Sequence, residues 1–148
     1  MSSFVKQVEE EANRVYSQNR LSLAEPRLVF SRALETRFND LKRVSSGKEK
    51  KEYESDICRL FVSRAAMEIN AKQHKQAKLV FDEAFKHDFC ERSSIVWIAY
   101  INFYIREKKT DLSRKHLREA VDTVDVIFNM YFYVAGQSSR DLGVLGSI

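Results

Sequence analysis

KLVFDEAFKHDF, residues 78–89, repeats a phrase that the chain has already used as RLVFSRALETRF, residues 27–38. Five of the twelve positions are identical, and both copies begin with a basic residue. The apolar residues of each copy recur at steps of three and four, which is the spacing of one face of an α-helix. The phrase therefore predicts that one helix is built twice, with Leu28, Phe30 and Ala33 in the buried stripe of the first copy.

The composition also favours helices. The chain has 148 residues, only four Gly and one Pro, and ten Phe, six Tyr and one Trp. This length suits one domain, and helix-forming residues with many aromatics suit a well-filled helical core. We expect an all-α fold of about six or seven helices. One helical-repeat domain is predicted over residues 1–135, followed by a flexible or docked tail over residues 136–148.

Breaks in the apolar pattern divide the first half of the chain. Ser2 or Ser3 can cap a first helix, and residues 19–22 offer a break after it. Pro26 falls in the first turn of a second helix, where its missing N–H is not needed. The clearest loop is VSSGKEKKE, residues 44–52, which holds a Gly, two Ser and a charge cluster.

The second half of the chain follows the same logic. A third helix is expected up to about Asn70, and a short connection at residues 72–75 leads to the fourth. Residues 95–106 are apolar on nearly every side, which is typical of a helix that is covered on both faces. Residues 108–111 are expected to end it. The pattern over residues 112–135 fits one long helix or two.

A period relates these helices to one another. Shifting residues 78–89 forward by 36 places brings Ala84 onto Ala120. The copy at residues 27–38 lies 51 places upstream instead, and the surplus of 15 is close to the length of the loop segment. We therefore interpret the chain as three antiparallel helical hairpins, with residues 44–52 inserted between the first and the second. Such hairpins stack because one hairpin cannot bury its own apolar faces.

Two segments of the chain carry a family resemblance. WIAYINF, residues 97–103, followed by RKHLREAV, residues 114–121, resembles the half-a-TPR (HAT) repeat, a relative of the tetratricopeptide repeat (TPR). Both copies of the repeated phrase resemble the second helix of that unit, and the likeness covers roughly residues 4–121. The resemblance implies a short TPR/HAT-like solenoid that acts as a non-catalytic scaffold. It also implies RNA-processing assemblies as the usual setting, with a protein partner and RNA as a further partner.

Two basic clusters stand out in a chain of net charge +4. Either could contact RNA or an acidic partner, since Lys and Arg neutralise phosphates. The alternative, solvated turns with helix-terminal charges, stays open. The first cluster comprises Lys42, Arg43, Lys48, Lys50 and Lys51, and the second comprises Arg106, Lys108, Lys109, Arg114, Lys115 and Arg118.

The C-terminal part is strongly apolar, although stacked helical repeats normally end in a polar cap. Such a surface must be covered by the tail, a second copy of the chain or a partner. We predict docking of a partner, or a homodimer, through residues 124–148. The interface candidates are Phe128, Tyr131, Phe132, Tyr133, Leu142 and Leu145.

No catalytic, cofactor or metal motif emerges from the sequence. The three His lie in charged segments, and Cys58 and Cys90 have no ligand spacing around them. We expect both Cys to be buried free thiols, which fits a reducing compartment, with a disulfide as the open alternative. No signal peptide or membrane span is expected, so we predict a non-enzymatic protein of the nucleus or cytoplasm. The alternative function is a small basic all-helical RNA-binding protein that acts as a dimer.

Overall fold

The computed structural model describes residues 2–110, except for the side chains of residues 108–110. Within this range every regular element is an α-helix, so the predicted all-α class is confirmed there. The helices are α1 (Ser3–Gln18), α2 (Ala24–Arg43), α3 (Lys48–Asn70), α4 (His74–Ala84), α5 (Asp88–Glu91) and α6 (Ser94–Thr110). The chain divides into two compact units, Met1–Val96 and Trp97–Ile148. The predicted tail at residues 136–148 lies outside the described residues.

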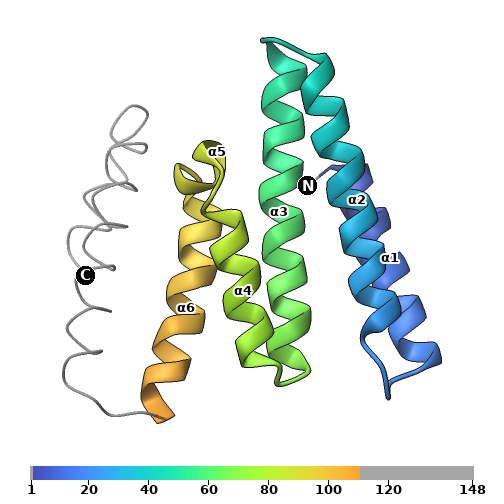
Figure 1. The fold of residues 1–148 in the computed structure, drawn as a ribbon, viewed down its shortest axis with the longest axis vertical. Coiled ribbons are helices and arrows are strands. Elements are labelled where there is room, and N and C mark those ends of the chain that lie inside the picture. Colours follow the sequence, from blue (N-terminus) through green and yellow to red (C-terminus); the bar gives the residue numbers. More distant parts are fainter. Residues whose placement is uncertain (1, 111–148) are drawn as a thin grey trace, which may run out of the picture. The chain divides into compact units, whose positions relative to one another are not determined.

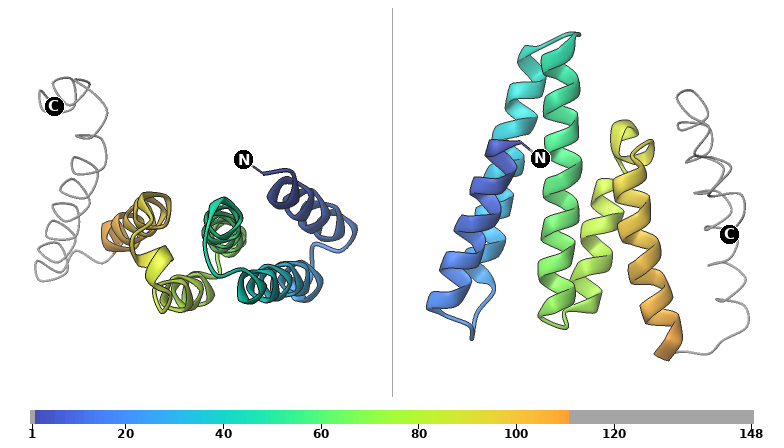
Figure 2. Two further views of the ribbon diagram at one scale, coloured as in Figure 1. Left: turned by 90° about the horizontal axis from the view of Figure 1, so that it is seen from above. Right: turned by 180° about the vertical axis from the view of Figure 1, so that it is seen from behind.

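Helices α1 to α4 of the first unit alternate in direction along the chain (Figure 1). Helix α2 packs against α1 and α3, α4 packs against α3, and α1 also touches α3. Seen from above, α1 and α3 lie on one side of this unit, and α2 and α4 lie on the other (Figure 2). Helix α3 therefore has neighbours on two sides, and it carries the largest group of buried residues in the unit.

Helix α1 begins where the sequence predicts. The Ser2 side chain caps it, because its Oγ accepts a hydrogen bond from the Val5 N–H at 3.2 Å. Four residues at steps of three and four are buried, namely Val5, Val8, Ala12 and Val15. The helix ends before Asn19, whose Oδ1 accepts a hydrogen bond from the Leu21 N–H at 3.1 Å. That local bond forms the predicted break.

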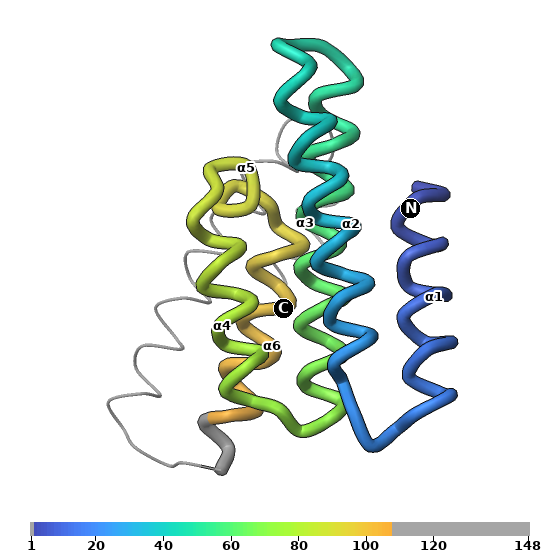
Figure 3. Tube along the Cα trace, turned by 45° about the vertical axis from the view of Figure 1, so that its right-hand side comes forward, coloured from blue at the N-terminus to red at the C-terminus, as the bar shows by residue number. Residues whose placement is uncertain are grey.

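The α2–α3 connection is shorter than the predicted loop at residues 44–52. Only residues 44–47 join the two helices, because α3 already begins at Lys48. Gly47 makes the turn with φ 100°, a left-handed value that favours glycine. The following Glu and Lys residues are good helix formers, so they continue the helix without any apolar stripe. The tip of this hairpin extends beyond the ends of α1 and α4 (Figure 3).

The two copies of the repeated phrase do not fold alike. Residues 27–38 lie entirely within α2, whereas α4 ends at Ala84 and residues 88–91 form α5. Only residues 44–47 between the two copies lie outside helices α2 and α3, so the surplus of 15 residues is largely helical rather than a loop insertion. The leucine shared by both copies is also not buried, since Leu28 is 44% exposed and Leu79 is 57% exposed.

Helix α6 is longer than predicted. It starts at Ser94 and continues to Thr110, whereas the sequence predicts a break at residues 108–111. Two lysines at its end favour continuation, because Lys is a good helix former and no Gly or Pro interrupts them. Ile98 and Ile105 are partly exposed, so the expected burial on nearly every side does not hold for these two residues. Among the helices of residues 2–110, none has the length and apolar character needed to cross a bilayer.

Candidate functional site

A groove of about 580 Å³ opens between α1 and α3 in the first unit. This volume lies within the usual range of ligand-binding pockets, about 300–1,000 Å³. Its apolar lining includes Val5, Phe30 and Met67. Its polar lining combines one acidic, one basic and four neutral side chains, namely Glu9, Arg59, Asn13, Tyr16, Ser63 and Asn70. The groove thus offers apolar surface beside several hydrogen-bonding groups.

Two of the groove side chains join its walls. The Ser63 hydroxyl of α3 donates a hydrogen bond to the Glu9 carboxylate of α1, with an O–O distance of 2.8 Å. Arg59 lies one helical turn before Ser63 and is half-buried. It forms no salt bridge within residues 2–110, so its charge is available to a ligand in the groove.

An ion pair between a partly exposed arginine and a buried glutamate holds α2 against α3. Arg27 donates two hydrogen bonds of 2.8 Å, from Nε and Nη2, to the two oxygens of Glu68. Glu68 is only 1% exposed, and its hydrogen bonds raise the pKa of Arg27. Arg64 lies one turn away on α3, where burial lowers its pKa and its Nε has no hydrogen-bond partner among the described residues. The charges of Arg27 and Glu68 stabilise the fold, since each satisfies the other.

A second arginine joins three helices. Arg37 of α2 donates from Nε to Asp56 at 2.9 Å and from Nη1 to Asp40 at 2.7 Å. Its guanidinium carbon also lies 3.7 Å from the ring centroid of Phe4 and 5.0 Å from that of Tyr53. Stacking on an aromatic face adds a cation–π attraction to the charge pairing. Arg37 is therefore fully engaged within the fold.

Three phenylalanine rings surround His87 at the start of α5. The ring centroids of Phe38, Phe61 and Phe89 lie 4.7, 6.0 and 5.6 Å from that of His87. The imidazole is half-buried among them. Its place in the structure is therefore that of a packing residue between α2, α3 and α5.

The two cysteines lie next to this ring cluster. Cys58 of α3 and Cys90 of α5 are both free and buried, as predicted. Their Sγ atoms are 3.4 Å apart and share a hydrogen bond. In residues 2–110, no group of three or more His, Cys, Asp or Glu side chains is arranged to hold a metal ion.

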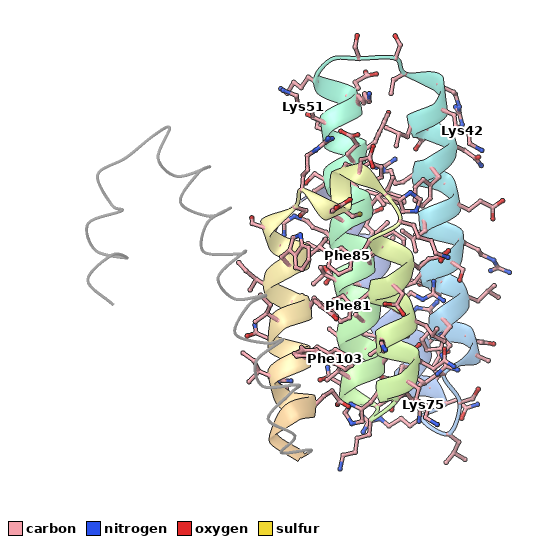
Figure 4. The ribbon with its side chains drawn as sticks, turned by 60° about the vertical axis from the view of Figure 1, so that its left-hand side comes forward. Lys42, Lys51, Lys75, Phe81, Phe85 and Phe103 are labelled. Carbon is pink, nitrogen blue, oxygen red and sulfur yellow. The ribbon has the colours of Figure 1, made fainter. Side chains whose placement is uncertain are left out.

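The first predicted basic cluster comes together at the tip of the α2–α3 hairpin. Figure 4 shows Lys42 and Lys51 at this same end, across the connection between the two helices. Lys42 and Arg43 lie in the last turn of α2, where a positive charge stabilises the helix dipole. The other three members lie in the first turn of α3, where a positive charge is unfavourable: Lys48, Lys50 and Lys51.

Most other predicted site residues lie outside the described part. Arg106 is an exposed residue of α6, and Lys108 and Lys109 belong to the same helix. These three residues are the members of the second cluster that the structure describes. The members that lie outside the described residues are Arg114, Lys115 and Arg118 from that cluster and Phe128, Tyr131, Phe132, Tyr133, Leu142 and Leu145 from the predicted interface.

The groove could not be predicted from the sequence. Its polar residues lie on helices that otherwise read as packing helices, and no motif marks them. A weak signal existed, since Glu9 and Asn13 are four residues apart, as are Arg59 and Ser63. Each pair therefore shares one helix face. Only the pairing of α1 with α3 turns these two faces into one site.

No protein-family model matches the chain, and neither the curated proteins nor the solved structures searched contain a match.

Proposed function

We propose that the chain is a non-catalytic helical-repeat scaffold that binds an extended segment of another protein in the groove between α1 and α3. The single observation behind this proposal is the groove itself, where apolar surface adjoins several hydrogen-bonding side chains. An extended peptide needs both, because its backbone N–H and C=O groups must be satisfied while its side chains bury apolar area.

The charge of the lining specifies the partner further. Glu9 already accepts a hydrogen bond from Ser63, whereas Arg59 has no carboxylate partner among the described residues. A half-buried guanidinium pairs best with a carboxylate, which it can bind through two parallel hydrogen bonds. The preferred ligand is therefore a segment that places an acidic side chain or a C-terminal carboxylate at Arg59.

The resemblance to half-a-TPR repeats supports the scaffold class and supplies its setting. In this proposal the chain works inside the cell, in the nucleus or cytoplasm, within an RNA-processing assembly. The antiparallel order of α1 to α4 is compatible with stacked hairpins. Dimerisation or docking through residues 124–148 belongs to the same proposal.

Affinity capture of the intact chain from nuclease-treated extract tests the groove. Arg59→Glu reverses the charge inside the groove, and Arg32→Glu makes the same change at an exposed position of α2 outside it. We expect bound proteins to be lost with Arg59→Glu and retained with Arg32→Glu. Proteins that remain bound equally to both variants would show that the groove is not the binding site.

The hairpin tip supports RNA binding as a second candidate function. Stabilisation of the helix dipole accounts for the positive charges of Lys42 and Arg43 at the end of α2. It does not account for three lysines in the first turn of α3. Each of those lysines works against the helix dipole, so selection for stability alone would disfavour them. Contact with phosphates offers a reason for keeping them there.

Binding of a mixed-sequence single-stranded RNA oligonucleotide to the full chain tests this second function. If the tip binds phosphates, the affinity of the wild-type chain for the RNA falls steeply as the salt concentration rises. Replacement of Lys48, Lys50 and Lys51 together by Gln then weakens binding and makes the affinity less dependent on salt. The control is a double variant in which Gln replaces Lys75 and Lys78, near the start of α4. An unchanged affinity in the triple variant would remove the tip as an RNA site.

A further inference from the structure

The two cysteines are already arranged for oxidation. Cys58 and Cys90 are 32 residues apart in the sequence, yet their Sγ atoms are 3.4 Å apart. A disulfide bond is about 2.05 Å long, so closure requires the two sulfurs to approach by little more than an ångström. The Cys58 Sγ also lies 3.8 Å from the Phe89 carbonyl oxygen, which places the thiol against the backbone of α5.

Access to these thiols depends on α5. Cys58 is 4% exposed and Cys90 is 0% exposed, so neither reacts freely with a solute. Helix α5 has only four residues and is held by short local bonds, such as Cys90 N–H to His87 C=O at 3.1 Å. Such a short element opens locally at a much lower free energy than the long helix beneath it. Opening of α5 exposes both sulfurs together.

The shared hydrogen bond favours ionisation of one of the two thiols, because the thiol that keeps its proton stabilises the neighbouring thiolate. The thiolate is the nucleophile in thiol–disulfide exchange. The pair therefore supplies an attacking sulfur and a second thiol that can resolve a mixed disulfide.

We propose that Cys58 and Cys90 form a reversible redox site that takes small-molecule disulfides as its oxidant and staples α5 to α3. One cysteine of the pair, as its thiolate, attacks one sulfur of the small disulfide, which forms a mixed disulfide and releases one small thiolate. The other cysteine then loses its proton and attacks the sulfur of the first, which closes the protein disulfide and releases the second thiolate. Two electrons pass to the small disulfide, and the two cysteine protons leave with the released thiols.

The disulfide would constrain more of the fold than the two cysteines. It closes a covalent ring that contains α4 and both turns flanking it. Phe89 precedes Cys90 directly, and its ring lies 6.5 Å from that of Phe38 on α2. Oxidation would therefore also fix the ring cluster that joins α5 to α2. This inference is independent of the groove and of the proposed partner.

Equilibration of the full chain in buffers of reduced and oxidised glutathione tests the site. After alkylation under denaturing conditions, we expect the oxidised chain to carry neither an alkyl group nor glutathione. Its mass should be lower than that of the reduced, unalkylated chain by two hydrogen atoms. Peptide mapping should link Cys58 to Cys90. Amide exchange of residues 88–91 should slow by roughly tenfold or more, because opening of α5 must now strain a covalent tie, and dithiothreitol should reverse this.

Single variants resolve the order of events. Cys90→Ala and Cys58→Ala should each stop at a glutathione adduct on the remaining cysteine, since no second thiol resolves it, and the variant that reacts faster identifies the attacking sulfur. The wild-type measurement decides the proposal even if a variant fails to fold. Two alkylatable thiols after equilibration in oxidised buffer, or a disulfide only between separate chains, would overturn it.

Discussion

Replacement of Arg27 by Met is the sharpest test of the packing between α2 and α3. Arg27 supplies both hydrogen bonds of 2.8 Å to Glu68, a carboxylate that is 1% exposed. Removal of one partner of a buried ion pair typically costs about 3–5 kcal/mol, because it leaves an uncompensated buried charge. The Arg27 side chain is 33% exposed, and Arg64 is close enough to attract Glu68 electrostatically. We therefore expect the lower end, about 3 kcal/mol of unfolding free energy.

Urea unfolding followed by circular dichroism measures this loss. With a slope of about 2 kcal/mol per molar urea, a loss of about 3 kcal/mol lowers the midpoint by about 1.5 M. The matched control is Arg14→Met, because Arg14 also donates two hydrogen bonds to a glutamate, Glu11, but both side chains are largely exposed. That control should leave the midpoint unchanged, since exposed ion pairs contribute little.

The double change of Arg27 and Glu68 to Met separates pairing from packing. If the cost of the single change comes from an unpaired charge, removal of both charges should restore most of the lost stability. A shift no larger for Arg27→Met than for Arg14→Met would refute the reasoning. A double variant that is as unstable as Arg27→Met would also refute it, because the loss of stability would then come from packing alone.

Three smaller predictions concern single positions and use the same unfolding assay. Ser2→Ala removes the cap of α1 and should cost about 1 kcal/mol, with fraying of residues 3–6 seen by amide exchange; unaltered exchange there would contradict the capping role. Ala84→Leu places extra volume at a fully buried site in α4 and should cost about 1–3 kcal/mol. Leu79→Gln, five residues earlier in the chain, should change stability by no more than about 0.5 kcal/mol, because Leu79 is 57% exposed.

The position of most helices could be predicted from local signals. Ser2 caps α1, Pro26 lies in the first turn of α2, and α3 ends at Asn70, as the sequence indicates. Helix α5 was missed because four residues carry too little periodicity to register. The start of α3 was misplaced because Lys48 and its neighbours form a solvated helix, which shows no apolar stripe.

The candidate sites were harder to predict because they depend on contacts between distant helices. The thiol pair joins residues that are 32 positions apart, and no local pattern relates Cys58 to Cys90. The groove likewise needs Glu9 and Ser63, which are 54 residues apart, to meet across two helices. The basic tip could be predicted in part, since its members are near in sequence, but a short turn between two helices stands in place of the expected loop at residues 44–52.

The repeated phrase shows most clearly how equal residues acquire unequal roles. Phe38 and Phe89 hold the same place in the two copies, and a strict repeat would put them in equivalent but separate environments. Instead, α4 ends at Ala84, and the chain turns back so that Phe89 arrives within 6.5 Å of Phe38. Both rings then pack on His87, which replaces Thr36 of the first copy. Because α4 stops early, α5 forms, and α5 is the element that carries Cys90 to Cys58.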